Sequence, residues 1–327
     1  MPARSANADA ARVTAALFVV LIHAAGVSWP CGISYNALAR FGVPVFVILS
    51  GYFMLSRAQT VGSIVRRAGR LLAVMVCWSA LYYAYILAVG ERQWEGAETM
   101  VRYLVTEPVH MWYIYTAVFL YAITPLLYVF CAHATRRQYE YAMLVLFGLG
   151  SVYELMHATA MFPTLMLIAE NAHLPWGVGF IFFYLLGGYL RRWSLSGAAA
   201  AVVYAMGALG AAMTVAGSLA LSRGGLNELL FRYTSPNVVL TAAAFTLFFL
   251  RLRLPESRRL GEAARCTLGV YLLHPLLIMT AQHLGIWEPE ALSLWIAIPL
   301  RAAAVFALSM LASLLLSRAP LLRKLVS

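Results

Sequence analysis

Long apolar segments separated by short polar loops run along the whole chain of 327 residues. Most of them have the roughly 17–25 residues that a helix needs to cross a membrane core of about 30 Å, and 175–190 and 237–252 are shorter. To within a few residues, the segments are 11–28, 38–56, 70–89, 111–131, 139–156, 175–190, 198–221, 237–252, 267–284 and 293–316. The pattern predicts an all-α, polytopic membrane bundle of about ten transmembrane helices, with residues 1–327 as a single integral-membrane domain.

The basic residues alternate between successive loops. Most of the 24 Lys and Arg residues fall in loops that share one side of the membrane if the segments are counted as above, for example the runs at 66–70, 136–137, 191–192 and 251–265. Cytoplasmic loops collect Lys and Arg. The chain is therefore expected to have both termini in the cytoplasm.

Composition supports the membrane interpretation. Hydrophobic residues make up 62% of the chain and charged residues 11%, against about 25% charged in an ordinary soluble domain. The formal net charge of +11 follows from the cytoplasmic loops, so we expect no nucleic-acid partner.

The cysteines are widely separated, and no His, Cys and Asp set has metal-ligand spacing, so we expect no metal site. They are Cys31, Cys77, Cys131 and Cys266.

Two ionisable residues of the first apolar segment are spaced so that they share one face of a helix. Arg12 and His23 are eleven residues apart, and eleven steps of about 100° turn the helix three times plus about 20°. The two side chains therefore share one face, about 16 Å apart along the axis. Asp9 precedes Arg12 by one turn and is expected to pair with it. An ionisable residue within a membrane is a functional candidate by default.

Six motifs, in order along the chain, resemble those of acyltransferase family 3. The first is Arg12 to His23, which matches the family's R-x10-H signature. The others lie at 41–53 (FGVPVFVILSGYF), 66–70 (RRAGR), 110–113 (HMWY), 235–237 (SPN) and 269–275 (GVYLLHP). The likeness is greatest to the stand-alone branch that O-acetylates surface-polysaccharide sugars. It implies a multi-pass enzyme of the bacterial inner membrane that moves an acyl group, with acetyl expected, from cytoplasmic acyl-CoA to a hydroxyl of a surface or lipid-linked glycan.

The resemblance assigns roles to particular residues. His23 is the expected catalytic residue, either as the base that deprotonates the acceptor or as a nucleophile that carries the acyl group. The cations expected to bind the phosphates of acyl-CoA are Arg12, Arg66, Arg67 and Arg70. The supporting candidates are Asp9, Ser50, Gly51, His110, Trp112, Glu154 and His274. No tightly bound cofactor is expected, since acetyl-CoA or another acyl-CoA is a substrate.

Two other classes of protein fit some of these observations. A secondary transporter or glycan exporter also has many spans, broken helices and embedded charges, but the ordered motifs favour the enzyme. A membrane sensor or structural subunit with a degenerate site is less consistent with the presence of both Arg12 and His23. The identity of the acceptor and the oligomeric state are open at this stage.

Overall fold

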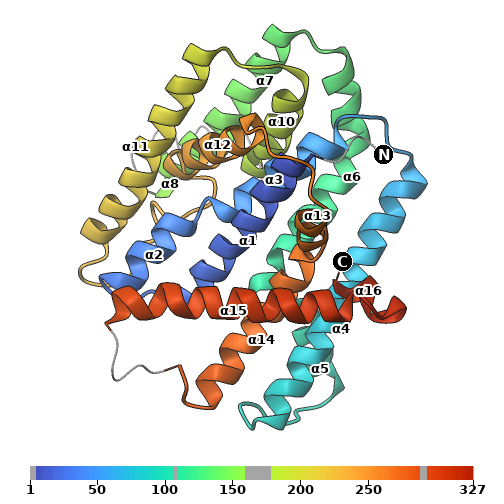
Figure 1. Cartoon of the computed structure of the whole chain (residues 1–327), viewed down its shortest axis with the longest axis vertical. Helices are drawn as coiled ribbons and strands as arrows, with labels where there is room; N and C mark the ends of the chain where they lie inside the picture. The colour runs from blue at the N-terminus through green and yellow to red at the C-terminus, as the bar shows by residue number, and fades with distance from the viewer. Residues whose placement is uncertain (1–4, 107–108, 159–177, 288–292, 327) are drawn as a thin grey trace.

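The computed structural model describes residues 5–106, 109–158, 178–287 and 293–326. Within these ranges all regular secondary structure is helical (Figure 1). The helices are α1 (Ala6–Ala25), α2 (Cys31–Ala39), α3 (Gly42–Met54), α4 (Val61–Ala88), α5 (Ala97–Thr106), η1 (Val109–Met111), α6 (Trp112–His133), α7 (Arg136–Phe147), η2 (Gly148–Val152), α8 (Tyr153–Ala158), α10 (Val178–Arg192), α11 (Gly197–Leu221), α12 (Pro236–Arg251), α13 (Arg258–Arg265), α14 (Thr267–His283), α15 (Leu294–Leu316) and α16 (Pro320–Val326).

The prediction of a polytopic helical membrane protein is confirmed, and the number of spans is confirmed only in part. In the described ranges six helices are long and apolar enough to cross a membrane: α1, α2 with α3, α4, α6, α11 and α15. Helices α13 and α14 form a seventh candidate, bent by 55°. The remaining apolar segments are helical but interrupted or short: a π-helical turn, η2, separates α7 from α8, and α10 and α12 have 15 and 16 residues.

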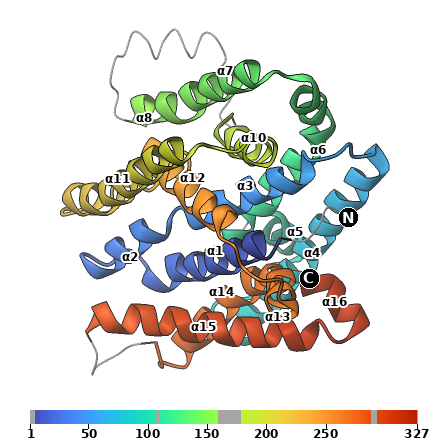
Figure 2. The ribbon, with the colours of Figure 1, turned by 45° about the horizontal axis from the view of Figure 1, so that its top comes forward.

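Helix α1 lies in the middle of the fold. Figure 2 shows α15 on one side of it and α12, α3 and α10 on the other, and α1 also contacts α2, α13 and α14. Small residues on α1 permit this crowding, because Ala11 and Ala15 are completely buried. A helix packed on all sides holds its side chains in fixed positions.

Glycines bring α3 and α10 into close contact. A Cβ atom at Gly51 would overlap the backbone carbonyl of Tyr184, and one at Gly187 would overlap the backbone of Ile48. Small residues permit such approaches between membrane helices. Gly51, one of the supporting candidates, therefore lies at a close contact between two helices.

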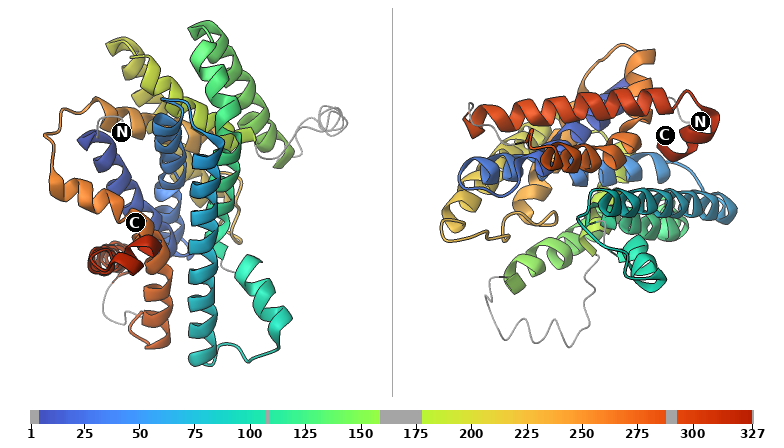
Figure 3. Two further views of the ribbon diagram at one scale, coloured as in Figure 1. Left: turned by 90° about the vertical axis from the view of Figure 1, so that its right-hand side faces the viewer. Right: turned by 90° about the horizontal axis from the view of Figure 1, so that it is seen from below.

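The C-terminal helix α16 packs against the long helix α4, which runs most of the height of the left panel of Figure 3. The Trp78 indole donates a hydrogen bond to the Leu325 carbonyl (3.1 Å), and an Arg70 Nη donates to the Lys324 carbonyl (3.4 Å). Helix α15 crosses α14, with Ser313 against Gly269 at the contact. These contacts hold α4 and α14, which both contribute to the site below.

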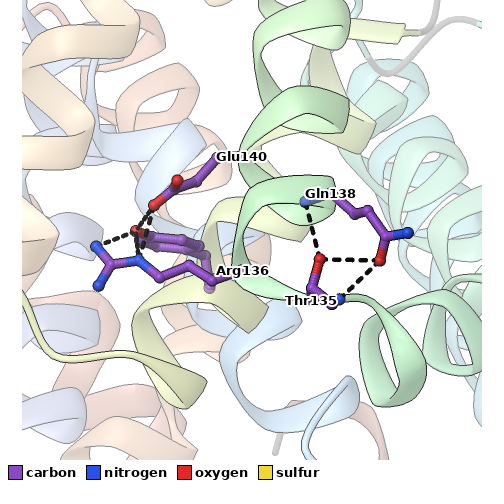
Figure 4. Close-up of polar contacts among 5 residues, drawn as sticks. Thr135, Arg136, Gln138 and Glu140 are labelled. Atoms are coloured by element: carbon purple, nitrogen blue, oxygen red, sulfur yellow. Dashed lines mark hydrogen bonds and ion pairs between the residues drawn. The ribbon is translucent and has the colours of Figure 1, made fainter.

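A compact polar cluster joins α7 to α10 (Figure 4). The Tyr189 hydroxyl donates to Glu140 Oε1 (2.6 Å), which also accepts from Arg136 Nε (2.8 Å). Nearby, the N-terminus of α7 is closed by a capping box between Thr135 and Gln138. Each charged group in the cluster has a partner of opposite charge or a hydroxyl.

Candidate functional site

Three histidines from distant parts of the chain meet at one end of α1. His23 is in the last turn of α1, His110 is in η1, and His274 is in the middle of α14. Ring centroids are separated by 4.9 Å between His23 and His274, 6.1 Å between His110 and His274, and 6.5 Å between His23 and His110. The fold thus gathers three residues that the sequence analysis had named separately.

One hydrogen bond fixes the His274 imidazole, and another holds the backbone of His110. His274 Nδ1 lies 2.9 Å from the Val270 carbonyl, which can only accept, so Nδ1 carries the proton and Nε2 of the neutral ring is an acceptor. The Tyr271 hydroxyl donates to the His110 carbonyl (2.5 Å), and this bond ties η1 to α14. Nε2 of both His110 and His274 is buried without a partner in the described chain. Buried polar atoms are nearly always paired, so these two nitrogens are available to a ligand.

The three histidines line a cavity of about 450 Å³, called here the histidine cavity. His23 is accessible from it, whereas His110 and His274 are 9% and 0% exposed. Its walls are mostly apolar or aromatic: Ala16, Val19, Val20, Ile22, His23, Gly26, Asn36, Arg40, Val43, Phe46, His110, Trp112, Tyr113, Tyr233, Thr267, Leu268, Val270, Tyr271 and His274. Apolar walls with a few convergent polar groups are typical of small-molecule sites.

The cavity extends along α1 toward Arg12. Ala16 lines it one turn beyond Arg12, and His23 lines it at the other end. The interval from Ala16 to His23 is about 10 Å of helix. Tyr113 also lines the cavity, and the charge of Arg12 reaches its hydroxyl electrostatically. The face shared by Arg12 and His23, predicted from their spacing, is therefore the face that borders the cavity.

Three of the four predicted phosphate-binding arginines gather around Tyr121 on α6. The charges of Arg12, Arg67 and Arg70 all act on its hydroxyl. The Arg12 guanidinium lies 5.8 Å from the centre of the Phe53 ring. Arg67 donates to the sulfur of Met54 (3.5 Å). The sequence predicted these cations from their positions at the ends of two segments, and the fold brings Arg12 and Arg67 to the neighbouring residues Phe53 and Met54 of α3.

The other predicted residues have more varied positions. Arg66 is exposed, and its Nε donates to the Gly62 carbonyl of its own helix (3.2 Å). Ser50 lies against the Tyr113 hydroxyl, and Asp9 is in the first turn of α1. Trp112 lines the histidine cavity and stacks on Tyr233 (5.3 Å between centroids). Glu154 is on α8, and its side chain lies outside the described residues.

Sequence reasoning missed several residues of the cavity wall. Tyr113, Tyr233 and Tyr271 are aromatic residues of the kind that any membrane boundary collects, so the sequence alone did not single them out. Arg40 was a visible signal, because it is a cation within an apolar segment. Its guanidinium lies over the rings of Phe231 and Tyr233 (4.9 and 5.3 Å), and its charge acts on His23. Arg301, the other embedded cation, lies over Trp287 (5.0 Å).

The described part of the chain contains no group of three or more His, Cys, Asp or Glu side chains arranged to hold a metal ion. The three histidines are close, but His274 directs Nδ1 to its own helix. The arrangement offers an accessible imidazole, His23, with two further imidazoles beside it whose Nε2 atoms are unpaired in the described chain. Such a set can accept a proton and orient a hydroxyl group.

Comparison with known proteins identifies the family. A family model described as an acyltransferase domain, that of acyltransferase family 3, matches residues 5–318. No curated protein and no solved structure matches the chain. The match covers nearly the whole sequence, including both ends of the histidine cavity and the arginines around Tyr121. The chain is thus a multi-pass membrane protein that belongs to acyltransferase family 3.

Proposed function

We propose that the protein transfers an acetyl group from acetyl-CoA to a hydroxyl of a surface or lipid-linked glycan. The family supports acyl transfer. The observation that carries the proposal is the joint placement of two groups on α1: cations suited to phosphates near Arg12, and an accessible imidazole, His23, in a cavity that extends toward them. The acetyl group and the glycan are the finer parts of the proposal.

The donor lies along α1. Its phosphates bind Arg12, Arg67 and Arg70, since guanidinium groups make strong, often bidentate bonds to phosphate. Its extended arm follows the cavity wall past Ala16 and Tyr113, and its thioester reaches His23, about 16 Å from Arg12 along the axis. Arg66, turned to its own helix, contributes long-range charge rather than a direct bond.

His23 acts as the general base. Its neutral imidazole takes the proton of the acceptor hydroxyl while the oxygen attacks the thioester carbonyl; the new C–O bond forms, the C–S bond breaks, and the coenzyme A thiolate leaves with the proton that His23 returns. His110 and His274 hold the acceptor through their unpaired Nε2 atoms. A neutral imidazole is needed, so turnover falls as the pH is lowered through the value at which His23 protonates.

The basic loops favour a cytoplasmic location for the arginine end of α1, with both termini inside. The donor then enters from the cytoplasm, and the histidine end faces the opposite side of a bacterial inner membrane. Reporter fusions or cysteine labelling at Ser5 and Val326 test this orientation. A label that reacts from outside at either position contradicts it.

The central experiment is an assay of the purified protein with radiolabelled acetyl-CoA and a panel of glycan acceptors. Wild type is expected to label an acceptor, and His23→Ala to bind acetyl-CoA without transferring the label. Rapid quenching followed by a search for acetylated His23 separates the base from the acyl carrier, since only the carrier accumulates labelled protein. A His23→Ala protein that transfers at the wild-type rate contradicts the proposal.

A further inference from the structure

A second cavity, of about 300 Å³, adjoins the histidine cavity. It is called here the aromatic cavity. Its walls are Arg40, Trp112, Phe180, Glu228, Phe231, Arg232, Tyr233 and Thr234. Arg40, Trp112 and Tyr233 line both cavities. A ligand held in the aromatic cavity therefore contacts side chains that also border the histidine cavity.

The aromatic cavity combines flat rings with hydrogen-bonding groups. Trp112 stacks on Tyr233 with an interplanar angle of 29°, and Phe180 lies 5.7 Å from Trp112. The charged residues on its walls are Arg40, Arg232 and Glu228, so the cavity offers both donors and an acceptor. A sugar ring has the matching surfaces, since its C–H face is apolar and its edge carries hydroxyls that both donate and accept. A volume near 300 Å³ is at the small end of ligand sites.

Arg40 marks the junction of the two cavities. Its guanidinium is held over the rings of Phe231 and Tyr233, and its Nε is buried without a hydrogen-bond partner in the described chain. The charge of Arg40 acts on His23. Asn36, one turn earlier on α2, donates to the Gly26 carbonyl (2.9 Å) and has an unpaired buried Oδ1 that also borders the histidine cavity. Unpaired buried groups at a junction are suited to a polar ligand that crosses it.

We infer that the aromatic cavity is the acceptor subsite, and that it holds one hexopyranose ring of a glycan. The ring lies against Trp112 and Tyr233, its hydroxyls bond to Arg40 and Glu228, and the hydroxyl to be acylated projects past Arg40 toward His23. This inference rests on the proposed function and names the residues that choose its acceptor. Glu228 accepts hydrogen bonds from sugar hydroxyls, and Arg40 and Arg232 on the same walls donate to them.

The test uses the full-length protein in detergent and two readouts. Saturation-transfer NMR with methyl glucoside, methyl galactoside and methyl N-acetylglucosaminide reports ring binding without turnover, and radiolabelled acetyl transfer to the same glycosides gives kcat and KM. The variants are Glu228→Gln, Tyr233→Ala and Arg40→Gln, with Arg40→Lys as the charge-conserving partner. Glu228 is exposed, so its variant is expected to fold. Glu98→Gln is the control, because Glu98 is an exposed glutamate on α5 that lines neither cavity.

At least one glycoside is expected to give saturation transfer to its ring C–H protons with wild type and Glu98→Gln, and much less with Tyr233→Ala. Loss of a hydrogen bond to a charged group predicts a rise of about tenfold or more in acceptor KM for Glu228→Gln. Acetyl-CoA affinity is expected to stay at the wild-type value, and Arg40→Lys to recover part of the Arg40→Gln loss.

Three results overturn the inference. Unchanged sugar binding and KM in Glu228→Gln and Tyr233→Ala, with normal acetyl-CoA binding, exclude the aromatic cavity and leave the proposed function in place. Binding of none of the glycosides by wild type, with acetyl transfer to a ring-free alcohol such as decanol, makes the acceptor a lipid. Failure of wild type to bind acetyl-CoA removes the proposed function and the inference together.

Discussion

Two regions of the molecule place polar side chains between helices but differ in hydrogen bonding. The side chains are paired in the cluster between α7 and α10, and some are unpaired in the histidine cavity. In the cluster, Arg136, Glu140 and Tyr189 bond to one another at 2.6–3.2 Å. In the cavity, Nε2 of His110 and of His274 is buried with no partner in the described residues. The side chains of the cluster bond to one another and so join α7 to α10.

The difference teaches how to separate structural from functional polar groups in an apolar protein. A group whose hydrogen bonds are complete has little left to offer a ligand, whereas an unpaired buried group costs stability unless a ligand pairs with it. Embedded charge alone does not make this distinction. The completeness of pairing, together with an adjoining cavity, does.

The largest effect is expected at His23. His23→Ala should lower acetyl transfer by about 10²–10⁴-fold, which is the usual contribution of a general base, and should leave acetyl-CoA binding nearly unchanged because the arginines lie about 16 Å away. Turnover and equilibrium binding of labelled acetyl-CoA check this on the folded variant. His283→Ala is the matched control, since His283 is exposed and lines neither cavity described above. Loss of donor binding in His23→Ala would instead assign the residue to the donor site.

A smaller effect is expected at the arginines. Arg12→Ala should weaken acetyl-CoA binding by about 10- to 100-fold, because a hydrogen bond between charged groups contributes about 1.5–3 kcal/mol, and Arg12→Lys should recover only part of it. Arg66→Ala should change the affinity much less, since its Nε bonds to the Gly62 carbonyl. Isothermal titration of both variants with acetyl-CoA makes the comparison. Equal losses at Arg12 and Arg66 would show that net charge alone attracts the donor.

The third prediction concerns packing. Gly51→Ala should lower the stability of the folded protein by about 1–3 kcal/mol, the usual range for overpacking, because the added Cβ would overlap the Tyr184 carbonyl. Gly62→Ala on α4 has nothing within 4 Å of the new Cβ and should be neutral or stabilising. Thermal unfolding in detergent measures both variants. Equal unfolding midpoints would mean that α3 and α10 separate easily.

The smallest effect is expected in the cluster of Figure 4. Glu140→Gln should leave acetyl transfer unchanged and shift thermal unfolding little, because the Glu140 side chain is 46% exposed and exposed ion pairs contribute little. The same activity and unfolding assays apply. A large loss of activity would show that a fully paired polar group also serves acetyl transfer.

Periodicity and composition predicted the helices well. Each apolar segment contains a helix within the described residues, and the shared face of Arg12 and His23 follows from the regular turn of α1. The breaks were harder to predict. The π-helical turn at η2 depends on local packing, such as Gly150 against Gly179, which a hydropathy pattern does not contain.

The site could be predicted only residue by residue. His23, His110 and His274 were each candidates from the sequence, but their meeting depends on how α1, η1 and α14 pack. Arg40 is a cation within an apolar segment, but the sequence gives it no role, because its aromatic partners Phe231 and Tyr233 lie far along the chain. Contacts between distant segments come from tertiary packing, and a single sequence does not reveal them.

The unbroken helix α1 has a consequence for the choice of donor. Because one rigid helix carries both Arg12 and His23, the separation between the phosphate-binding end and the reacting end is constant. Under the proposed function, a thioester whose arm is shorter or longer than this interval would bind by its phosphates yet present its carbonyl at the wrong level. The enzyme would then select donors by the length of their carrier, and the size of the acyl group would be limited separately by the walls of the histidine cavity.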